Sequence, residues 1–184
     1  RKALSMLPDL PYSAWRGTLH TLHRFLQIVG TVRLGASSRR NHWWNVPFHV
    51  TGRGLTTRPM GEEVPFTIDF DLRDHRLELI AASGLEYSFP LTGLSVADFY
   101  TRVTAGLEAI GADARIAHPY PFDLPDSGRP FTEDTEHASY DVRAVDKAWV
   151  ILSRMALILE TFAADFSGKT SPVHLFWHSG DVAV

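Results

Sequence analysis

Three strand-like runs between residues 65 and 91 are separated only by short polar links, and this spacing constrains the fold most. The clearest run is "PFTIDFDL", in which Phe66, Ile68, Phe70 and Leu72 share one face and polar residues occupy the other. Links as short as "RDHR" join neighbouring antiparallel strands. We therefore predict an antiparallel meander with one covered face and one wetter face. Its expected strands are residues 42–51, 65–72, 76–81 and 86–91.

Three segments show the apolar period of amphipathic helices. Residues 11–30 form the first, and the glycine at its end is a typical helix stop. Ser95 and Asp98 match a capping box that opens a second helix, which ends near residue 110. A strong apolar stripe over residues 142–166 predicts the third helix.

The remaining segments complete the predicted architecture. "ARIAHPY" and the terminal "SPVHLFWHSGDVAV" are expected strands, and residues 118–141, rich in proline and acidic side chains, are an expected long loop. The order of elements indicates one α+β domain over residues 1–184. It should contain a mainly antiparallel sheet, with three main helices packed largely on one face.

Charge is distributed unevenly along the chain. No Asp or Glu occurs between Leu10 and Gly61, whereas residues 62–184 hold nine basic and twenty acidic side chains, a net of −11. The acid-free segment contains seven arginines: Arg16, Arg24, Arg33, Arg39, Arg40, Arg53 and Arg58. Two interpretations stay open. The arginines bind an anionic ligand, or they pair internally with the acidic part.

Composition excludes several classes of function. The chain has no cysteine, which rules out disulfides, thiol catalysis and thiolate metal ligands. No apolar run is long enough to span a bilayer, so we expect a soluble, cytoplasmic protein that does not bind membranes. The local positive charge contains no lysine and lies in a chain of net charge −3, which argues against nucleic acid as the partner. A homo-oligomer stays open.

The segment "NHWWNVPFHVTGRGLTT" concentrates candidate ligand-binding side chains. We assign His42, Trp44, His49 and Arg53 to a ligand pocket, with Arg53 gripping an anion. On a regular strand the odd separation of His42 and His49 would place them on opposite faces, so they would not share one metal ion.

A second candidate site is the acidic stretch "TEDTEHASYD". Glu136, His137 and Tyr140 supply a carboxylate, an imidazole and a phenol for proton chemistry. The alternative is that this stretch is the solvated start of the following helix. His20 and His23, one helical turn apart, are a half-site for a divalent metal, with a solvated polar pair as the alternative. No cofactor motif is present.

Four stretches carry a resemblance to a known family: "TLHRFLQIVGTVRL", "NHWWNVPFHVTGRGLTT", "EDTEHASYD" and "SPVHLFWHSGDVAV". They resemble an uncharacterised bacterial family catalogued as a domain of unknown function. The resemblance covers nearly the whole chain and implies membership, without an activity, cofactor or catalytic residue. Members of that family continue beyond the position of Asp181, so we expect this chain to be part of a longer protein.

Three functional hypotheses follow. The first is a protein, enzyme or not, that binds a small anionic ligand between its sheet and the acidic loop. The second is a non-catalytic structural or partner-binding module whose arginines and acids pair internally. The third is a divalent-metal enzyme that uses His20, His23, Glu136 and His137.

Overall fold

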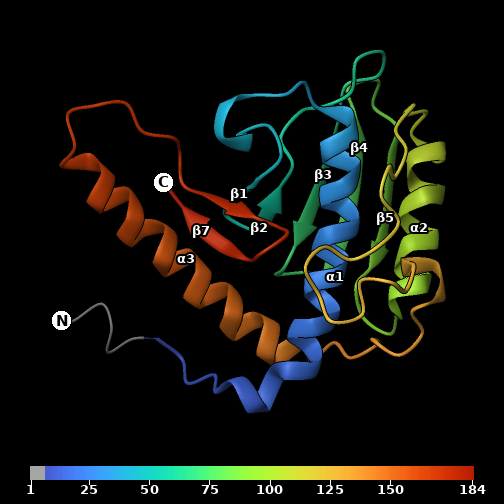
Figure 1. The fold of residues 1–184 in the computed structure, drawn as a ribbon, viewed down its shortest axis with the longest axis horizontal. Coiled ribbons are helices and arrows are strands. Elements are labelled where there is room, and N and C mark those ends of the chain that lie inside the picture. Colours follow the sequence, from blue (N-terminus) through green and yellow to red (C-terminus); the bar gives the residue numbers. More distant parts are fainter. Residues whose placement is uncertain (1–6) are drawn as a thin grey trace.

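The computed structural model describes residues 7–184 as three long helices and a seven-stranded sheet (Figure 1). The helices are α1 (Tyr12–Ala36), α2 (Val96–Ala109) and α3 (Val142–Ala164), with single 3-10 turns η2 (Asn41–Trp43) and η3 (Phe131–Glu133). The strands are β1 (Phe48–Val50), β2 (Gly54–Thr56), β3 (Phe66–Asp71), β4 (Arg76–Ala81), β5 (Glu86–Pro90), β6 (His174–Phe176) and β7 (Asp181–Ala183).

The sheet is antiparallel throughout, with strand order β5-β4-β3-β2-β1-β6-β7. Strands β1 to β5 pair in chain order as a meander, and the hairpin of β6 and β7 extends the sheet beyond β1. The predicted α+β class and mainly antiparallel sheet are therefore confirmed. The expected runs 65–72, 76–81 and 86–91 each become a strand within one or two residues of their predicted ends.

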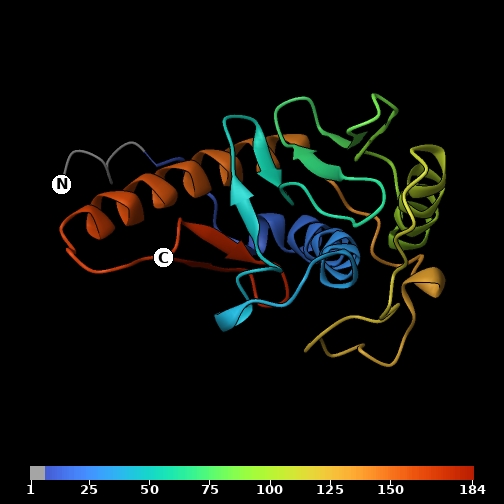
Figure 2. The ribbon, with the colours of Figure 1, turned by 90° about the horizontal axis from the view of Figure 1, so that it is seen from above.

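The two faces of the sheet differ in chemistry. Phe70 of β3 stacks near Phe99 of α2, which stacks in turn on Phe25 of α1 with ring centroids 4.0 Å apart. These stacked rings fix one face of the sheet against α1 and α2. Figure 2 shows α1 nearly end-on. The opposite face is polar. Strand register aligns one continuous row across it: His174, His49, Thr56, Asp69, Glu78 and Ser88.

Helix α1 continues past its predicted end, so the assignment of Gly30 as a stop is wrong. The helix runs six residues further, to Ala36, and Gly30 lies in its interior against the indole of Trp177. A glycine permits close approach here rather than a left-handed turn. Trp177 also donates its Nε1–H to the carbonyl oxygen of Val46 at 3.0 Å, which fixes the segment that precedes β1.

The prediction of one strand over residues 42–51 is wrong, because only residues 48–50 pair as β1. His42 and Trp43 have positive φ angles of 54° and 57°, and they form the turn η2. Asn45 closes this loop by accepting a hydrogen bond from the main-chain N–H of Arg40. Strand alternation does not apply to His42, so the opposite-face argument for the two histidines has no structural basis.

Two other predicted strands also differ. "ARIAHPY" forms no strand; its main chain lies near Gly35 of α1. The terminal stretch is a hairpin and not one strand, because Gly180, with φ of 82°, turns the chain back after β6. The long loop at residues 118–141 is confirmed, interrupted only by η3.

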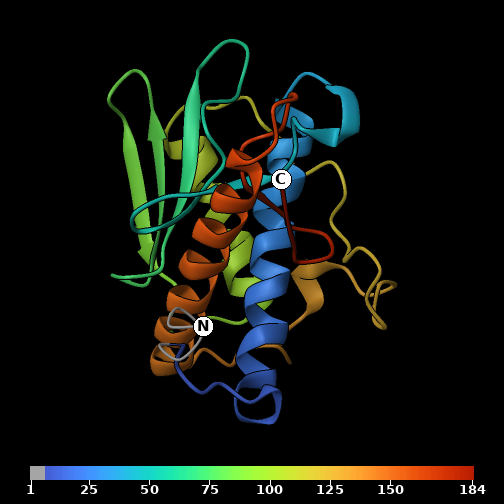
Figure 3. The ribbon, with the colours of Figure 1, turned by 90° about the vertical axis from the view of Figure 1, so that its left-hand side faces the viewer.

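Helix α3 is covered better near its start than near its end, and Ala156 is its last buried residue. Val145 is buried, and Trp149 and Leu152 pack against the core. Phe162 is 72% exposed and Phe166 61% exposed, so the apolar stripe predicted from sequence continues into solvent. Figure 1 shows the start of α3 close to α1 and its end directed away from the rest of the molecule, and Figure 3 views the molecule from the side on which that end lies.

The packing of Trp177 on Gly30 leads to a stability prediction. A Cβ atom at position 30 would lie 2.1 Å from Cδ2 of Trp177. We expect Gly30→Ala to lower the free energy of unfolding by about 2 kcal/mol, because overpacking outweighs the better helix propensity of alanine. Urea denaturation of both proteins measures this difference.

Gly52→Ala is the matched control, because a Cβ there would meet no heavy atom within 4 Å. Its unfolding midpoint should stay close to that of the wild type. Equal midpoints for Gly30→Ala and Gly52→Ala would contradict the packing that we describe.

Candidate functional site

A basic pocket lies beyond the end of α1, and it encloses a cavity of about 520 Å³. Its walls come from the last turn of α1, the loop after that helix, β1 and the loop between β2 and β3. The pocket-lining side chains able to contact a ligand are Arg33, Ser37, Ser38, Arg40, Trp44, Asn45, His49, Arg58 and Glu62. We call this cavity the arginine pocket. Its chemistry is dominated by guanidinium and imidazole groups.

Arg33 is the least solvated charge in the arginine pocket. The residue is only 5% exposed, and its Nε is buried without a hydrogen-bond partner among residues 7–184. Burial lowers the pKa of Arg33 to about 10, and the positive charges of Arg58 and Arg40 contribute to the shift. The side chain therefore remains charged at neutral pH. A buried charge without a counter-charge is costly, so a bound anion would stabilise this arrangement.

Arg58 and Arg40 add two more cations that have no acidic partner. Within the described part of the chain, neither guanidinium takes part in an ion pair or a side-chain hydrogen bond. The backbone of Arg58 has a φ of 61°, a conformation uncommon outside glycine. The hydroxyl of Thr56 accepts from the Arg58 N–H, and the hydroxyl of Thr57 donates to the Arg58 carbonyl oxygen. Two threonines thus hold this arginine in a strained conformation, as occurs at functional sites.

His49 presents an imidazole to the arginine pocket. Its cross-strand partner is His174, and the two ring centroids lie 6.4 Å apart. Burial is the main influence that lowers the pKa of His49, and Arg58, Arg33 and His174 lower it further, to about 4. His49 is therefore neutral at pH 7, beside three charged arginines.

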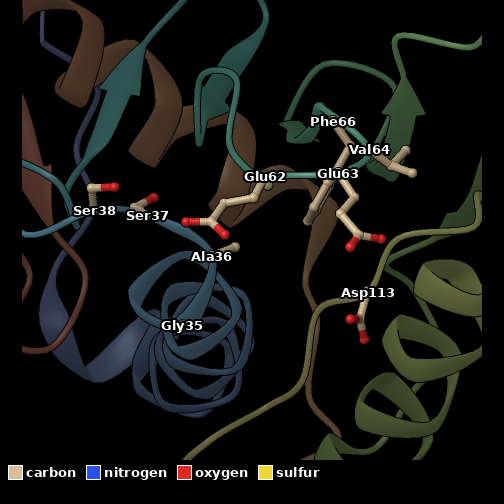
Figure 4. A pocket seen from close by; sticks show the side chains of 10 residues that line it. Gly35, Ala36, Ser37, Ser38, Glu62, Glu63, Val64, Phe66 and Asp113 are labelled. Atoms are coloured by element: carbon tan, nitrogen blue, oxygen red, sulfur yellow. The ribbon is translucent and has the colours of Figure 1, made fainter.

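An acidic cavity of about 270 Å³ adjoins the arginine pocket and shares several of its walls. Figure 4 shows the carboxylate of Glu62 directed toward Ser37, while Glu63 and Asp113 lie together on the side nearer α2. All three acidic residues are exposed. Of the three, only Glu62 also lines the arginine pocket, and Arg33 does not line the acidic cavity.

The structure separates the four ligand-binding residues predicted from sequence. Trp44 and His49 line the arginine pocket. His42 is exposed beside Trp44, with ring centroids 5.1 Å apart. Arg53 does not line the pocket; it forms ion pairs with Asp71, at 2.5 Å, and with Asp74. Arg53 thus follows the internal-pairing interpretation, and Arg33 and Arg58 take its place in the cavity.

The long loop at residues 118–141 forms a buried ion cluster against α1. Arg24 is 4% exposed, and its guanidinium contacts Asp126 at 2.5 Å and Asp134 at 3.4 Å. Asp134 also accepts a 2.8 Å hydrogen bond from Nδ1 of His137. Burial alone would raise the pKa of Asp126, but the hydrogen bond and charge of Arg24 outweigh it and leave that pKa below its ordinary value. The cluster ties the long loop to α1.

A divalent metal would meet a different set of ligands from those predicted. Oxygen and nitrogen atoms of Asp126, Asp134 and His137 lie within 4.8 Å of one another, a spacing that could hold an ion. However, Arg24 and Arg129 already place positive charge against these carboxylates. A cation would have to compete with both guanidinium groups.

The other predicted residues have partners elsewhere. Glu136 is exposed and forms a 2.9 Å ion pair with Arg129. The Tyr140 hydroxyl hydrogen-bonds Nδ1 of His75 at 3.0 Å, and burial raises the pKa of Tyr140. A phenol with a raised pKa gives up its proton less readily, so this contact fits a structural link between the β3–β4 turn and the segment that leads into α3.

His20 and His23 do not form a joint half-site. Nε2 of His20 lies 3.2 Å from the Tyr12 hydroxyl, and Nε2 of His23 lies 3.1 Å from the carbonyl oxygens of Trp177 and His178. Because a carbonyl oxygen only accepts hydrogen bonds, Nε2 of His23 carries a proton and is not a metal ligand in this arrangement.

Comparison with known proteins adds membership and nothing about activity. A family model described as "Family of unknown function (DUF5996)" matches residues 7–184. The chain belongs to this family. No curated protein and no solved structure matches it. Across residues 7–184, no helix has the length and apolar character needed to cross a membrane.

The segment "NHWWNVPFHVTGRGLTT" contributes Trp44 and His49 to the arginine pocket, whereas its Arg53 pairs with acids outside the pocket. The absence of acids between residues 10 and 61 was the available signal, since it includes Arg33, Arg40 and Arg58. Which arginines pair internally depends on tertiary contacts. Arg24 and Arg53 meet carboxylates from distant positions, whereas the pocket arginines do not.

The buried ion cluster yields a prediction for Arg24. Replacement by methionine would leave Asp126 and Asp134 without their main counter-charge in a poorly solvated place. We expect Arg24→Met to lower the free energy of unfolding by about 3 kcal/mol, measured by urea denaturation at pH 7. Arg129→Met is the control, since this arginine is far more exposed, and its effect should be much smaller. Equal losses in both variants would contradict a central role of Arg24.

A second prediction concerns the pH dependence of stability. The pKa of His49 is about 4 in the folded protein and about 6.5 when unfolded, so the unfolded chain binds more protons between these values. Stability should therefore fall as pH decreases from 6.5 to 4, with His49 contributing on the order of 1–2 kcal/mol after solvent screening. In His49→Gln this part of the loss should disappear, as measured by urea denaturation across that pH range. Identical pH profiles would show that His49 is not held neutral.

Proposed function

We propose that this protein binds a small oxyanion, a phosphate- or carboxylate-bearing compound, in the arginine pocket. The observation that carries the proposal is the buried guanidinium of Arg33, which has no acidic partner among residues 7–184. An oxyanion would supply both the missing charge and the missing acceptors, because guanidinium groups match carboxylate and phosphate oxygens in bidentate geometry.

The surroundings of Arg33 support the same ligand class. Arg40 and Arg58 bring the number of guanidinium groups that line the pocket to three, none of them ion-paired to another residue of 7–184, and the hydroxyls of Ser37 and Ser38 are additional donors. The indole of Trp44 provides an apolar wall for the part of the ligand beyond its charged group. A volume of about 520 Å³ suits a small metabolite better than a polymer.

An enzyme at this site would first bind its substrate in the same way, through the oxyanion in the arginine pocket. His49 is the one neutral titratable side chain that lines the cavity with the arginines. His49 is in a position to exchange a proton with a bound compound. If the protein is an enzyme, His49 is therefore our candidate for the general acid or base. The Glu136, His137 and Tyr140 group does not line the pocket and supports no step at it.

Arg33→Met tests the proposal through two effects of opposite direction. Without ligand, the variant should be as stable as the wild type or more stable, because it removes an unpaired buried charge. With added anions, the wild type should show a rise in melting temperature that the variant lacks. Thermal-shift measurements against phosphorylated and carboxylated compounds, with isothermal titration of each compound that shifts the wild type, measure both.

Arg154→Met is the charge-matched control, since Arg154 is exposed on α3 outside the pocket. It should keep the full response to anions. If no phosphate or carboxylate shifts the wild type, or if Arg33→Met responds as the wild type does, the proposal is wrong.

A further inference from the structure

The histidines beside the arginine pocket point to a more specific ligand. We propose that His49, oriented by His174, accepts a hydrogen bond from the ligand, so that the pocket selects oxyanions that carry a hydroxyl on or next to the charged group. Hydrogen phosphate and 2-hydroxycarboxylates belong to this class, whereas sulfate and plain carboxylates do not. This inference rests on the proposed oxyanion site and adds the chemistry by which that site would discriminate.

The hydrogen-bond chain starts at a main-chain carbonyl. Nδ1 of His174 lies 2.7 Å from the carbonyl oxygen of Pro172. A carbonyl oxygen only accepts hydrogen bonds, so Nδ1 carries the proton. In the neutral ring this leaves Nε2 as an acceptor. His174 is 2% exposed, and its Nε2 is buried without a donor among the described residues.

Strand register determines which group approaches that acceptor. His49 is the direct partner of His174 across β1 and β6, so both rings project from the same face of the sheet. A centroid separation of 6.4 Å is a distance that one bridging water or a small rotation of the half-buried His49 would close. An N–H of His49 is thus the natural donor to His174.

The tautomer of His49 then decides what it offers the ligand. A neutral imidazole has one N–H and one lone pair. With the N–H directed at His174, the second nitrogen of His49 presents its lone pair to the arginine pocket. Burial, with Arg58, Arg33 and His174, lowers the pKa of His49 and preserves this lone pair at neutral pH. The pocket therefore offers one imidazole acceptor among arginine and serine donors.

A single acceptor among donors discriminates between anions of similar shape. The lone pair repels a fully ionised oxygen but accepts a hydrogen bond from a hydroxyl. A site built to hydrogen-bond a hydroxyl rejects the analogue that lacks it more strongly than an apolar pocket would. His49 is thus a specificity-determining residue, whereas Arg33 provides the affinity common to all oxyanions.

Two matched ligand pairs test this inference on the unaltered protein. Isothermal titration compares hydrogen phosphate with sulfate, under mildly alkaline conditions where both carry two charges, and glycolate with acetate. We expect the hydroxyl-bearing member of each pair to bind about tenfold more tightly or better. His49→Leu should bind both members of each pair equally. His174→Leu should reduce the preference, because His174 no longer fixes which nitrogen of His49 carries the proton.

The outcomes separate this inference from the proposed function. If sulfate binds as tightly as hydrogen phosphate and acetate as tightly as glycolate, the inference is overturned while the oxyanion site stands. If none of the four anions binds, this inference fails, and the proposed function fails with it when no phosphorylated or carboxylated compound shifts the melting temperature of the wild type. Arg33→Met should lose all four anions, and its loss of only the hydroxyl-bearing pair would overturn the assignment of selectivity to His49. A melting temperature for each variant confirms that it is folded.

Discussion

The packing of Trp177 on Gly30 is the contact on which the rest of the structure depends. The indole occupies the space that a side chain on α1 would fill, and its N–H bonds the carbonyl oxygen of Val46. One residue therefore joins the helix, the hairpin of β6 and β7, and the segment that leads into β1. Because β1 and β6 are both held by it, His49 and His174 meet at a defined register. The arginine pocket thus rests on an apolar contact outside its own walls.

Two buried arginines of α1 have opposite surroundings. Arg24 meets Asp126 and Asp134 from the long loop, and this pairing closes the loop onto the helix. Arg33 lies nine residues further along, is buried to the same degree, and meets other arginines instead of acids. A protein that needed only stability would place an apolar side chain at position 33. Keeping a cation at position 33 destabilises the fold. Residues that destabilise a fold are found mainly at functional sites, so this cost is a physical argument for a bound ligand.

The sheet was predictable from sequence because its information is local. Alternation in "PFTIDFDL" and the short polar links indicate strands and their order without any long-range knowledge. The capping box at Ser95 and Asp98 is equally local, and both of its hydrogen bonds are present. Sequence alone does not reveal the role of Gly30, because a glycine that permits close packing looks the same in sequence as a glycine that ends a helix. The tertiary partner that distinguishes them, Trp177, is 147 residues away.

The candidate site was predictable as a region and not as a set of residues. His42 lies in a left-handed turn and not in a strand. That turn, η2, depends on hydrogen bonds made by Asn45 and Trp177, which close its loop. Arg53 was a reasonable choice by residue type, yet Asp71 and Asp74 approach it from the β3–β4 turn. Pairing between a residue and a distant carboxylate is a property of the fold, and no local pattern encodes it.

The acid-free segment has a physical consequence for the arginine pocket. Arg33, Arg40 and Arg58 all come from it, so Arg33 and Arg40 have no carboxylate within twenty residues along the chain, and the first one after Arg58 is Glu62. Glu62, the first acid after the segment, reaches only the rim, where its exposed carboxylate is directed toward Ser37 (Figure 4). Carboxylates that hold the other buried or turn-proximal arginines come from later strands and loops. Segregating charge along the chain therefore leaves three guanidinium groups without an ion pair within the part of the fold that the structure describes, which is the condition that an oxyanion site requires.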